Sequence, residues 1–263
     1  MLVLSSERPP MGFICTELNF HRPPGDAWNE RTWSFPLIHE LGVGLRLDRV
    51  VSTKEYPEDL IQNVANAAKI LADKGCVGIL TSCGFLAMAQ QELSKRLPIP
   101  IATSSLLQIP AVQAFLPSGK VVGVITFDGD RLTPKHFEKL GIAHGERIPV
   151  VGTPPNGHLR RVERDGIPYV QEDLENELVE CARRLLGENP NVGAILLECT
   201  QLPCFAKVVQ QAVKLPVYDV FTMGEWFYSG LVRKNFAPWT EQEKVEATWK
   251  RPRTKEEMAE SQI

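Results

Sequence analysis

Two cysteines, Cys83 and Cys199, stand at matching places in two similar stretches of the chain. Val77–Cys83 and Val192–Cys199 each have the pattern of an apolar strand that ends in the cysteine, and each leads on to a Leu-Pro pair and a further apolar run. In open parallel sheets, functional groups collect just beyond the C-terminal ends of strands. We therefore expect the two thiols to face one cleft from opposite sides.

A pair of opposed thiols suits the removal and return of a proton on carbon. Abstracting a hydrogen next to a carboxylate needs a matched base and stabilisation of the developing charge. A cysteine at a strand-to-helix turn lies near a helix N-terminus, which is expected to lower the thiol pKa. Gly84 lets the backbone approach a substrate closely, and Thr200 and Gln201 offer donors for its carboxylate. This chemistry requires neither a metal nor a cofactor such as pyridoxal phosphate.

The remaining thiols and two histidines are predicted to be structural or solvated. Three cysteines are interpreted as buried small hydrophobic residues: Cys76, Cys181 and Cys204. Cys15 stays open between a packing role and a chemical one. Two histidines in polar surroundings are expected to be solvated and outside the site: His136 and His158. The sequence contains no CxxC pair, no zinc-ligand spacing and no glycine-rich nucleotide fingerprint.

The composition of the 263-residue chain is that of an ordinary globular protein, 43% hydrophobic and 23% charged. Its formal net charge of −3 gives no general attraction to nucleic acid, which we do not expect as a partner. No window approaches the roughly 18 apolar residues of a membrane span, and the first residues lack the pattern of a secretory signal. The expected location is the cytoplasm, where the six cysteines are free thiols. Whether the protein forms a homo-oligomer stays open.

Short apolar runs alternate with helical patterns along the chain, which is typical of a parallel sheet covered by helices. The predicted class is therefore α/β. Helices are predicted over Pro57–Ala72 and Glu172–Leu186, where apolar residues recur at helical spacing. The predicted strands are Met11–Thr16, Leu45–Val51, Val77–Ser82, Ile99–Thr103, Val121–Thr126, Val192–Glu198 and Val217–Val220.

The repeated pattern predicts two similar Rossmann-like (flavodoxin-like) halves, related by a pseudo-twofold axis, with the active-site cleft between them. Residues 1–103 plus 218–235 are assigned to the half with Cys83, residues 104–217 to the half with Cys199, and residues 236–263 to a charged C-terminal tail. The polar segment His21–Asp26 follows the first strand, and its Pro-Pro-Gly-Asp sequence predicts a turn. Arg22 in that loop is a candidate for clamping a substrate carboxylate.

At the two cysteines the sequence resembles the aspartate/glutamate racemase superfamily, whose members carry one cysteine in each of two similar α/β halves. The motifs are Thr-Ser-Cys-Gly-Phe at Thr81–Phe85 and Leu-Glu-Cys-Thr-Gln at Leu197–Gln201, and the resemblance runs from Met11 to about Phe236. In detail the chain is similar to algal dimethylsulfoniopropionate lyases of the Alma type. That similarity rests on the Cys-Gly-Phe turn and on three further segments: Ser104–Val112, Leu196–Thr200 and Leu215–Asp219.

The resemblance implies further substrate-binding residues and narrows the range of expected substrates. The implied residues are Thr16 at the end of the first strand, where the following loop begins, Ser104 or Ser105 at a helix start, and Thr126 at the end of the central strand. Amino-acid racemases of the superfamily carry Asn-Thr after the first cysteine, where this chain has Gly84-Phe85. That departure argues against an ordinary aspartate or glutamate substrate. The retained pair of cysteines argues against the arylmalonate decarboxylase branch, which the resemblance associates with a single catalytic cysteine.

These observations predict a cofactor-independent enzyme of the racemase or epimerase type that uses Cys83 and Cys199 to abstract the α-proton of a small carboxylic acid. One alternative is a β-eliminating lyase of the dimethylsulfoniopropionate type, which shares the first step and forms acrylate. A second alternative is a non-catalytic protein that binds a small acid in the same cleft.

Overall fold

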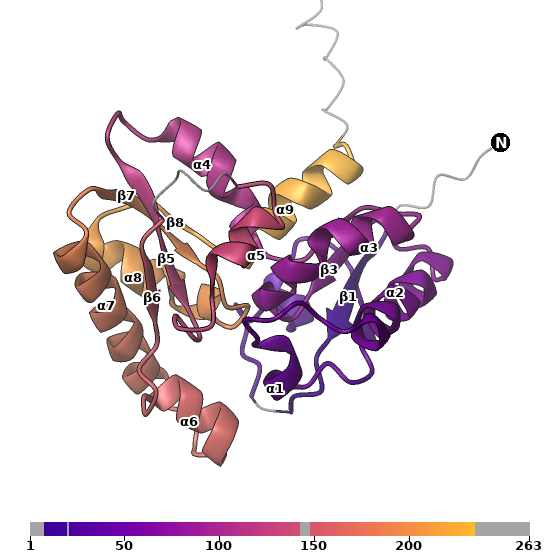
Figure 1. Ribbon diagram of the computed structural model, residues 1–263, viewed down its shortest axis with the longest axis horizontal. Coiled ribbons are helices and arrows are strands. Elements are labelled where there is room, and N and C mark those ends of the chain that lie inside the picture. Colours follow the sequence, from indigo (N-terminus) through magenta and orange to yellow (C-terminus); the bar gives the residue numbers. More distant parts are fainter. Residues whose placement is uncertain (1–7, 20, 143–147, 235–263) are drawn as a thin grey trace, which may run out of the picture. The chain divides into compact units, whose positions relative to one another are not determined.

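A computed structural model describes residues 8–19, 21–142 and 148–234 of the protein (Figure 1). The predicted tail at residues 236–263 lies outside the described residues. The described part up to Val232 forms one unit that contains two sheets. None of the helices that the described residues form is long and apolar enough to cross a membrane.

The first sheet has four parallel strands in the order β2-β1-β3-β4. Its strands are β1 (Met11–Cys15), β2 (Leu37–Leu41), β3 (Ile79–Thr81) and β4 (Ile101–Ala102). Strand β1 is buried along its whole length, as expected for a parallel strand covered by helices on both faces. Cys83 follows β3, an inner strand of this sheet.

The second sheet repeats this order as β6-β5-β7-β8, again with every pair parallel. Its strands are β5 (Val121–Thr126), β6 (Val150–Gly152), β7 (Val192–Leu197) and β8 (Val217–Tyr218). In each half the third strand in sequence lies beside the first, and the second lies at the edge. The prediction of two similar α/β halves is confirmed.

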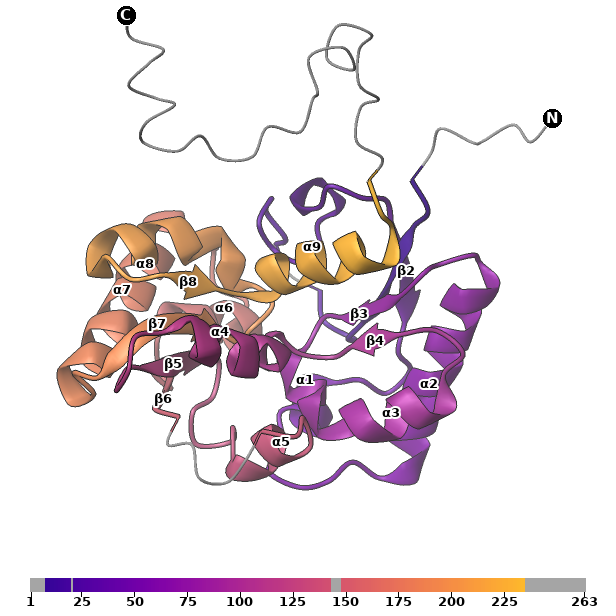
Figure 2. The ribbon, with the colours of Figure 1, turned by 90° about the horizontal axis from the view of Figure 1, so that it is seen from above.

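Helices separate the strands in both halves, as Figure 2 shows from above. The two predicted helices are present as α2 (Glu58–Asp73) and α7 (Gln171–Glu188), each of which buries an apolar face. The other α-helices are α1 (Leu47–Val50), α3 (Gln90–Arg96), α4 (Ile109–Phe115), α5 (Pro134–Glu138), α6 (His158–Asp165), α8 (Ala206–Val213) and α9 (Val220–Leu231). Short 3-10 helices are η1 (Glu30–Thr32), η2 (Gly84–Ala89), η3 (Ser105–Gln108) and η4 (Leu202–Phe205).

The predicted strand at Leu45–Val51 is wrong, because this segment forms a turn and the short helix α1. Leu45, Val50 and Val51 are buried, but their spacing lets a helical turn bury them and leaves the intervening charged residues outside. The strand beside β1 is instead β2, which contains His39 and Glu40 and therefore lacks the continuous apolar run of a buried strand. Strand β6 was also missed. Both are edge strands, and β6 is only three residues long, too short to show a period.

The last helix returns from the second sheet to pack on the first half. Val220, Met223 and Tyr228 of α9 are buried against Met11 and Phe13 of β1. The Asp219 side chain begins the helix by accepting the Thr222 N–H, a capping interaction that defines its start. Strand β8 pairs within the second sheet, so the chain changes halves directly after Tyr218. The assignment of residues 1–103 plus 218–235 and of 104–217 to two domains stays a prediction.

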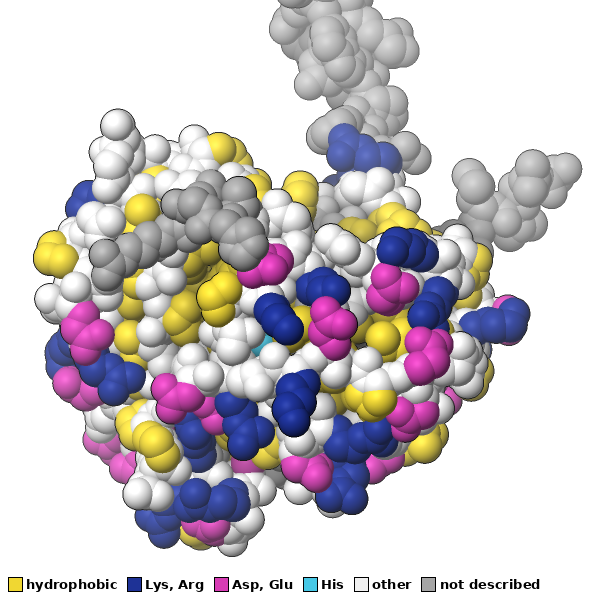
Figure 3. Space-filling model, in the orientation of Figure 1, with side chains coloured by type: hydrophobic (Ala, Val, Ile, Leu, Met, Phe, Trp, Pro, Cys, Tyr) yellow, Lys and Arg dark blue, Asp and Glu magenta, His cyan; other side chains and the backbone are white. Residues whose placement is uncertain are grey.

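Polar contacts also join the two halves beside the sheets. Arg131 Nη1, which follows β5, donates to the Val51 carbonyl at 2.8 Å, and Lys139 Nζ lies 3.0 Å from Glu55 Oε1. The face shown in Figure 3 carries basic and acidic side chains interspersed over its surface. Exposed ion pairs of this kind contribute little stability, commonly about 0–1 kcal/mol each, so the halves are held mainly by buried apolar contacts.

Candidate active site

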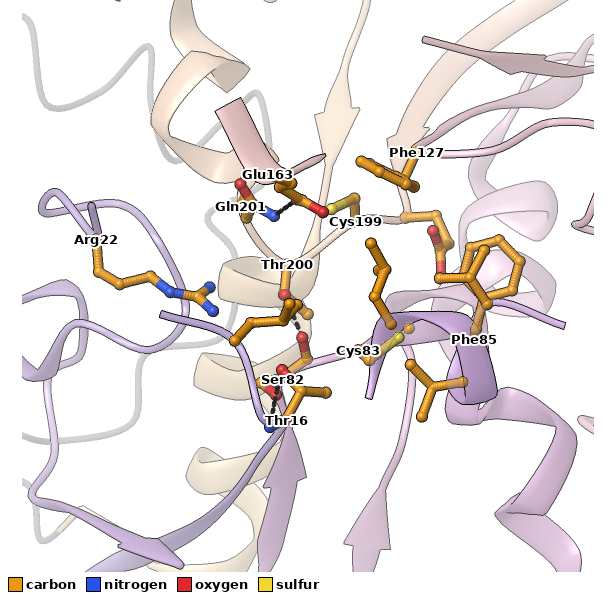
Figure 4. Close-up of a pocket in the computed structure, with 16 residues that line it drawn as sticks. Thr16, Arg22, Ser82, Cys83, Phe85, Phe127, Glu163, Cys199, Thr200 and Gln201 are labelled. Atoms are coloured by element: carbon orange, nitrogen blue, oxygen red, sulfur yellow. Dashed lines mark hydrogen bonds between the residues drawn. The ribbon is translucent and has the colours of Figure 1, made fainter. Parts of the chain in front are cut away.

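Cys83 and Cys199 line one pocket, a cavity of about 30 Å³. Cys83 follows β3 and Cys199 follows β7, which hold equivalent positions in the two sheets. Figure 4 shows the two thiols reaching the pocket from opposite sides, Cys83 beside Ser82 and Cys199 beside Glu163 and Gln201.

Six of the predicted substrate-binding residues line this pocket with the cysteines: Thr16, Arg22, Gly84, Phe85, Thr200 and Gln201. Three others lie behind its wall with their hydroxyls engaged. Ser104 Oγ accepts the Leu106 N–H, Ser105 Oγ donates to the Leu197 carbonyl at 3.0 Å, and Thr126 Oγ1 donates to Glu198 Oε2 at 2.7 Å. Contact of these three residues with substrate stays a prediction.

The turn that carries Cys83 is bonded to both neighbouring segments. Ser82 Oγ accepts the Thr16 N–H at 2.7 Å, which joins the end of β3 to the end of β1. Thr200 Oγ1 donates to the Ser82 carbonyl at 2.7 Å, which joins the Cys83 turn to the Cys199 turn of the other half (Figure 4). Because these bonds are buried, their loss would leave unsatisfied polar groups at about 1–3 kcal/mol each. The two cysteine turns are therefore positioned relative to each other.

The expectation of thiols with lowered pKa values is wrong. Burial raises the pKa of Cys83 far above its ordinary value, and the Glu198 carboxyl raises it further. The N–H groups of Phe85 and Leu86 do act on this thiol in the lowering direction, but burial outweighs them. Burial also raises the pKa of Cys199, with Glu163 and Glu198 adding to the rise. Both thiols are therefore protonated at neutral pH in the free protein.

Glu198 is a pocket residue that the sequence-based prediction missed. Its side chain is only 1% exposed, and burial raises its pKa to about 7 although the Thr126 hydroxyl opposes the rise. Its second oxygen, Oε1, has no hydrogen-bond partner among the described residues. A signal was available, since Glu198 stands directly before Cys199 at the end of an otherwise apolar strand. A buried carboxyl without full pairing is costly, which marks such positions as functional candidates.

Glu163 of α6 is the second missed carboxyl. Gln201 Nε2 donates to its Oε1, and burial raises the pKa of Glu163 to about 7. The remaining oxygen, Oε2, is buried without a partner among the described residues. The sequence around Glu163 is rich in charges and resembles an ordinary exposed helix, so only the packing of α6 over the pocket reveals it.

Arg22 is the cationic side chain among the residues that line the pocket. Its Nη1 lies 3.1 Å from Asp26 Oδ2, and its guanidinium lies 4.7 Å from the centre of the Trp28 ring. Both contacts orient the side chain, which points toward the other pocket residues in Figure 4. An arginine in this position is suited to holding a carboxylate by paired hydrogen bonds.

The histidines and the other cysteines lie apart from the pocket lining. The prediction of a solvated His136 is wrong, because its side chain is fully buried edge-on against Phe85, and burial lowers its pKa to about 4. His158 is partly buried, 3.5 Å from Asp173. Cys76 and Cys181 are buried as predicted, and Cys204 is partly buried. Cys15, whose role the sequence left open, is buried. Within the described ranges, no three His, Cys, Asp or Glu side chains gather as metal ligands.

The raised pKa values of the two pocket glutamates, Glu198 and Glu163, predict a pH-dependent stability. Glu198 binds its proton more tightly in the folded protein than its ordinary pKa of 4.5 implies. Its contribution to the free energy of unfolding is therefore full below about pH 4.5 and is lost as the pH rises through about 7. We expect the free energy of unfolding to fall by up to about 3 kcal/mol over this interval on account of Glu198. Glu163 acts in the same direction.

Urea unfolding at pH 5 and pH 8 measures this effect. Glu198→Gln is expected to flatten the dependence by removing one titrating group, while Glu188→Gln, the same change at an exposed position of α7, should leave it unaltered. An unchanged pH dependence in Glu198→Gln would contradict the assignment.

The fold and the pocket together define a class, that of two-sheet α/β proteins in which the third strand of each half delivers a cysteine to one pocket. The family model of the Asp/Glu/hydantoin racemases matches residues 52–226. The chain therefore belongs to the Asp/Glu/hydantoin racemase family.

Individual relatives agree with this membership. The chain is 28% identical over 226 residues to a dimethylsulfoniopropionate lyase of Durusdinium sp. clade D, covering 84% of this chain and 75% of that protein. It is 25% identical over 228 residues to dimethylsulfoniopropionate lyase 5 of Emiliania huxleyi strain CCMP1516, of which it spans 45%. Allantoin racemase from Pseudomonas fluorescens shares the fold, with a TM-score of 0.60 at 15% identity over 85% of this chain and 91% of that one.

Proposed function

We propose that this protein is a cofactor-independent racemase or epimerase that moves the α-proton of a small carboxylic acid between Cys83 and Cys199. The observation that carries the proposal is the position of both cysteines at the ends of equivalent strands on one pocket. One sulfur, as thiolate, takes the α-proton from one face of the carbon. The other thiol returns a proton to the opposite face, which inverts the centre.

The remaining pocket residues supply binding and charge stabilisation. Arg22 holds the substrate carboxylate, and the second N–H of the Gln201 amide, whose first is donated to Glu163, can bond to it as the carbanion forms. Phe85 and Phe127 provide apolar walls that keep water from the reacting carbon. The reaction needs reduced thiols, so we propose the cytoplasm as its location.

A second candidate function is β-elimination, which the names of the relatives favour, since both of the curated relatives described above are dimethylsulfoniopropionate lyases. The first step is the same removal of an α-proton by a cysteine. The electron pair of the broken C–H bond then forms the double bond of acrylate, and the β-carbon releases its sulfide with the electrons of the C–S bond. The Gly84-Phe85 pair in place of a polar pair suits a substrate other than aspartate or glutamate.

The test is incubation of the protein in deuterated water with a panel of small carboxylic acids, followed by NMR. The panel contains single enantiomers of α-substituted acids together with dimethylsulfoniopropionate. Racemisation predicts deuterium at the α-carbon with loss of enantiomeric purity, whereas elimination predicts acrylate and dimethyl sulfide. Saturable binding without exchange or product for any acid would overturn both and leave the binding-protein alternative.

A further inference from the structure

The pocket that holds the two thiols, which we call the reaction pocket, is too small for the proposed substrate. Its cavity of about 30 Å³ has room for about two water molecules. Even the smallest acid with an asymmetric α-carbon is larger than that. A larger cavity of about 640 Å³, the outer cavity, shares part of its lining and lies within the range of small-molecule sites, about 300–1,000 Å³. A part of the wall must therefore move before an acid can reach the thiols.

The wall between the two cavities consists of residues that line both of them. These are Leu18, Leu47, Val51, Phe127 and Glu163. Leu47 and Val51 belong to residues 46–56, the segment that contains α1 and leads to α2. Phe127 comes from the second half, directly after β5. The segment 46–56 therefore forms one side of the passage from the outer cavity to the thiols.

The short helix α1 depends on its surroundings for its position. It has four residues, and an isolated helix of that length is not stable in water. The N–H groups of Val50 and Val51 donate to the Arg46 and Leu47 carbonyls, so these backbone hydrogen bonds stay within the segment. Segments of this kind open locally at a lower free energy than the strands of a sheet.

Side chains from both halves hold neighbouring carbonyls at the end of α1. The Tyr56 hydroxyl lies 2.7 Å from the Val50 carbonyl and 2.8 Å from the Phe85 carbonyl of the first half. From the second half, Arg131 Nη1 donates to the Val51 carbonyl at 2.8 Å. Arg131 also lines the outer cavity, so it is placed to hold the segment from the side on which an acid arrives.

We propose that residues 46–56 are a gate between the outer cavity and the reaction pocket, and that Arg131 is the positioning residue that holds the gate closed from the second half. An acid enters when Leu47 and Val51 move away from Phe127, and its carboxylate then reaches Arg22 in the reaction pocket. Closure behind the acid separates the reacting carbon from bulk water. The inference rests on the proposed function for the kind of molecule that enters.

The test compares two thiol reagents of the same chemistry and different size, N-ethylmaleimide and the bulky N-(1-pyrenyl)maleimide. Peptide mass spectrometry measures the rate at each cysteine in wild type, Arg131→Ala and the control Arg183→Ala. Arg183 is exposed on α7, pairs with Glu180 and lies outside the lining of both cavities. Both reagents attack the thiolate, so the ratio of their rates at one cysteine reports on access and is independent of the thiol pKa.

In Arg131→Ala the ratio of the bulky to the small reagent is expected to rise about tenfold at Cys83 and Cys199. Loss of a hydrogen bond from a charged donor shifts the gate toward its open position by a factor of this order. The control variant, and Cys204 of η4 in every sample, should keep the wild-type ratio. An unchanged ratio at both pocket cysteines would overturn the proposal.

The buried thiols of Cys76 and Cys181 report on general loosening of the protein. They are expected to keep their low wild-type rates in Arg131→Ala. A rise at these two cysteines in parallel with the pocket cysteines would show that the variant loosens the whole protein, which also overturns the gate.

Amide hydrogen exchange in the same proteins locates the movement. The amides of residues 46–56 are expected to exchange several-fold faster in Arg131→Ala than in wild type, while those of α2 keep their rate. A raised labelling ratio without faster exchange in 46–56 would mean that another part of the wall opens, and the assignment of the gate would fall. If no acid is turned over in any assay, the proposed function fails, while the labelling ratios and the exchange rates still decide whether this segment is a gate.

Discussion

Replacing either Cys83 or Cys199 by serine is expected to lower inversion of an α-carbon by about 10³-fold or more, because serine cannot replace a thiol as acid or base at neutral pH. Inversion needs abstraction on one face and protonation on the other, so both variants should lose it to a similar degree. Each variant should still exchange the α-hydrogen of one enantiomer, since one thiol remains on one face. Enantiomer-resolved rates in deuterated water measure both properties.

β-Elimination requires different groups from inversion, so the two cysteine-to-serine variants distinguish the two reactions. After the α-proton is removed, the β-leaving group departs without reprotonation, so a lyase requires one basic thiol. A strongly unequal loss in the two variants, with acrylate released by the wild type, would replace the racemase assignment by the lyase. Cys204→Ser is the matched control, because Cys204 does not line the pocket. Wild-type turnover in both pocket variants would remove the thiols from the mechanism.

Gly84→Ala is expected to reduce activity by about 10²-fold or more and to cost about 1–3 kcal/mol of stability. The added methyl group would lie 2.7 Å from the Glu198 carbonyl and in closer conflict with its carboxyl. Since the carbonyl belongs to the backbone at the end of β7, it cannot move without shifting Cys199. The strain therefore displaces Glu198, Cys199 or the Cys83 turn from its present position.

The matched control for this change is Gly187→Ala in α7. A methyl group there meets no atom within 4 Å, and alanine is the better helix former by about 0.5–1 kcal/mol, so the control should gain stability and keep full activity. Urea unfolding and initial rates on the two purified variants provide the comparison. A Gly84→Ala protein with wild-type stability and turnover would show that the two cysteine turns are less tightly packed than the structure indicates.

The α/β class and the doubled architecture could be predicted because they follow from local pattern. A buried parallel strand is a continuous apolar run, and β3 and β7 carry that run with a cysteine after each. The edge strands β2 and β6 could not be predicted in the same way. Strand β2 contains His39 and Glu40, and β6 has only three residues, so both segments are compatible with a loop until they pair with β1 and β5.

The sequence by itself determined the two halves, the pair of cysteines and six further residues that line the pocket beside them. Those residues were accessible to prediction because they follow the ends of strands, where position in the chain implies position in the fold. Only the tertiary structure decided the electrostatics. The pKa of a thiol depends on which groups surround it, and Glu198 and Glu163 approach Cys83 and Cys199 through packing that links distant segments of the chain. Burial and these two carboxyls reverse the effect expected of the helix starts, because desolvation of a charge in the interior outweighs the attraction of a few backbone N–H groups.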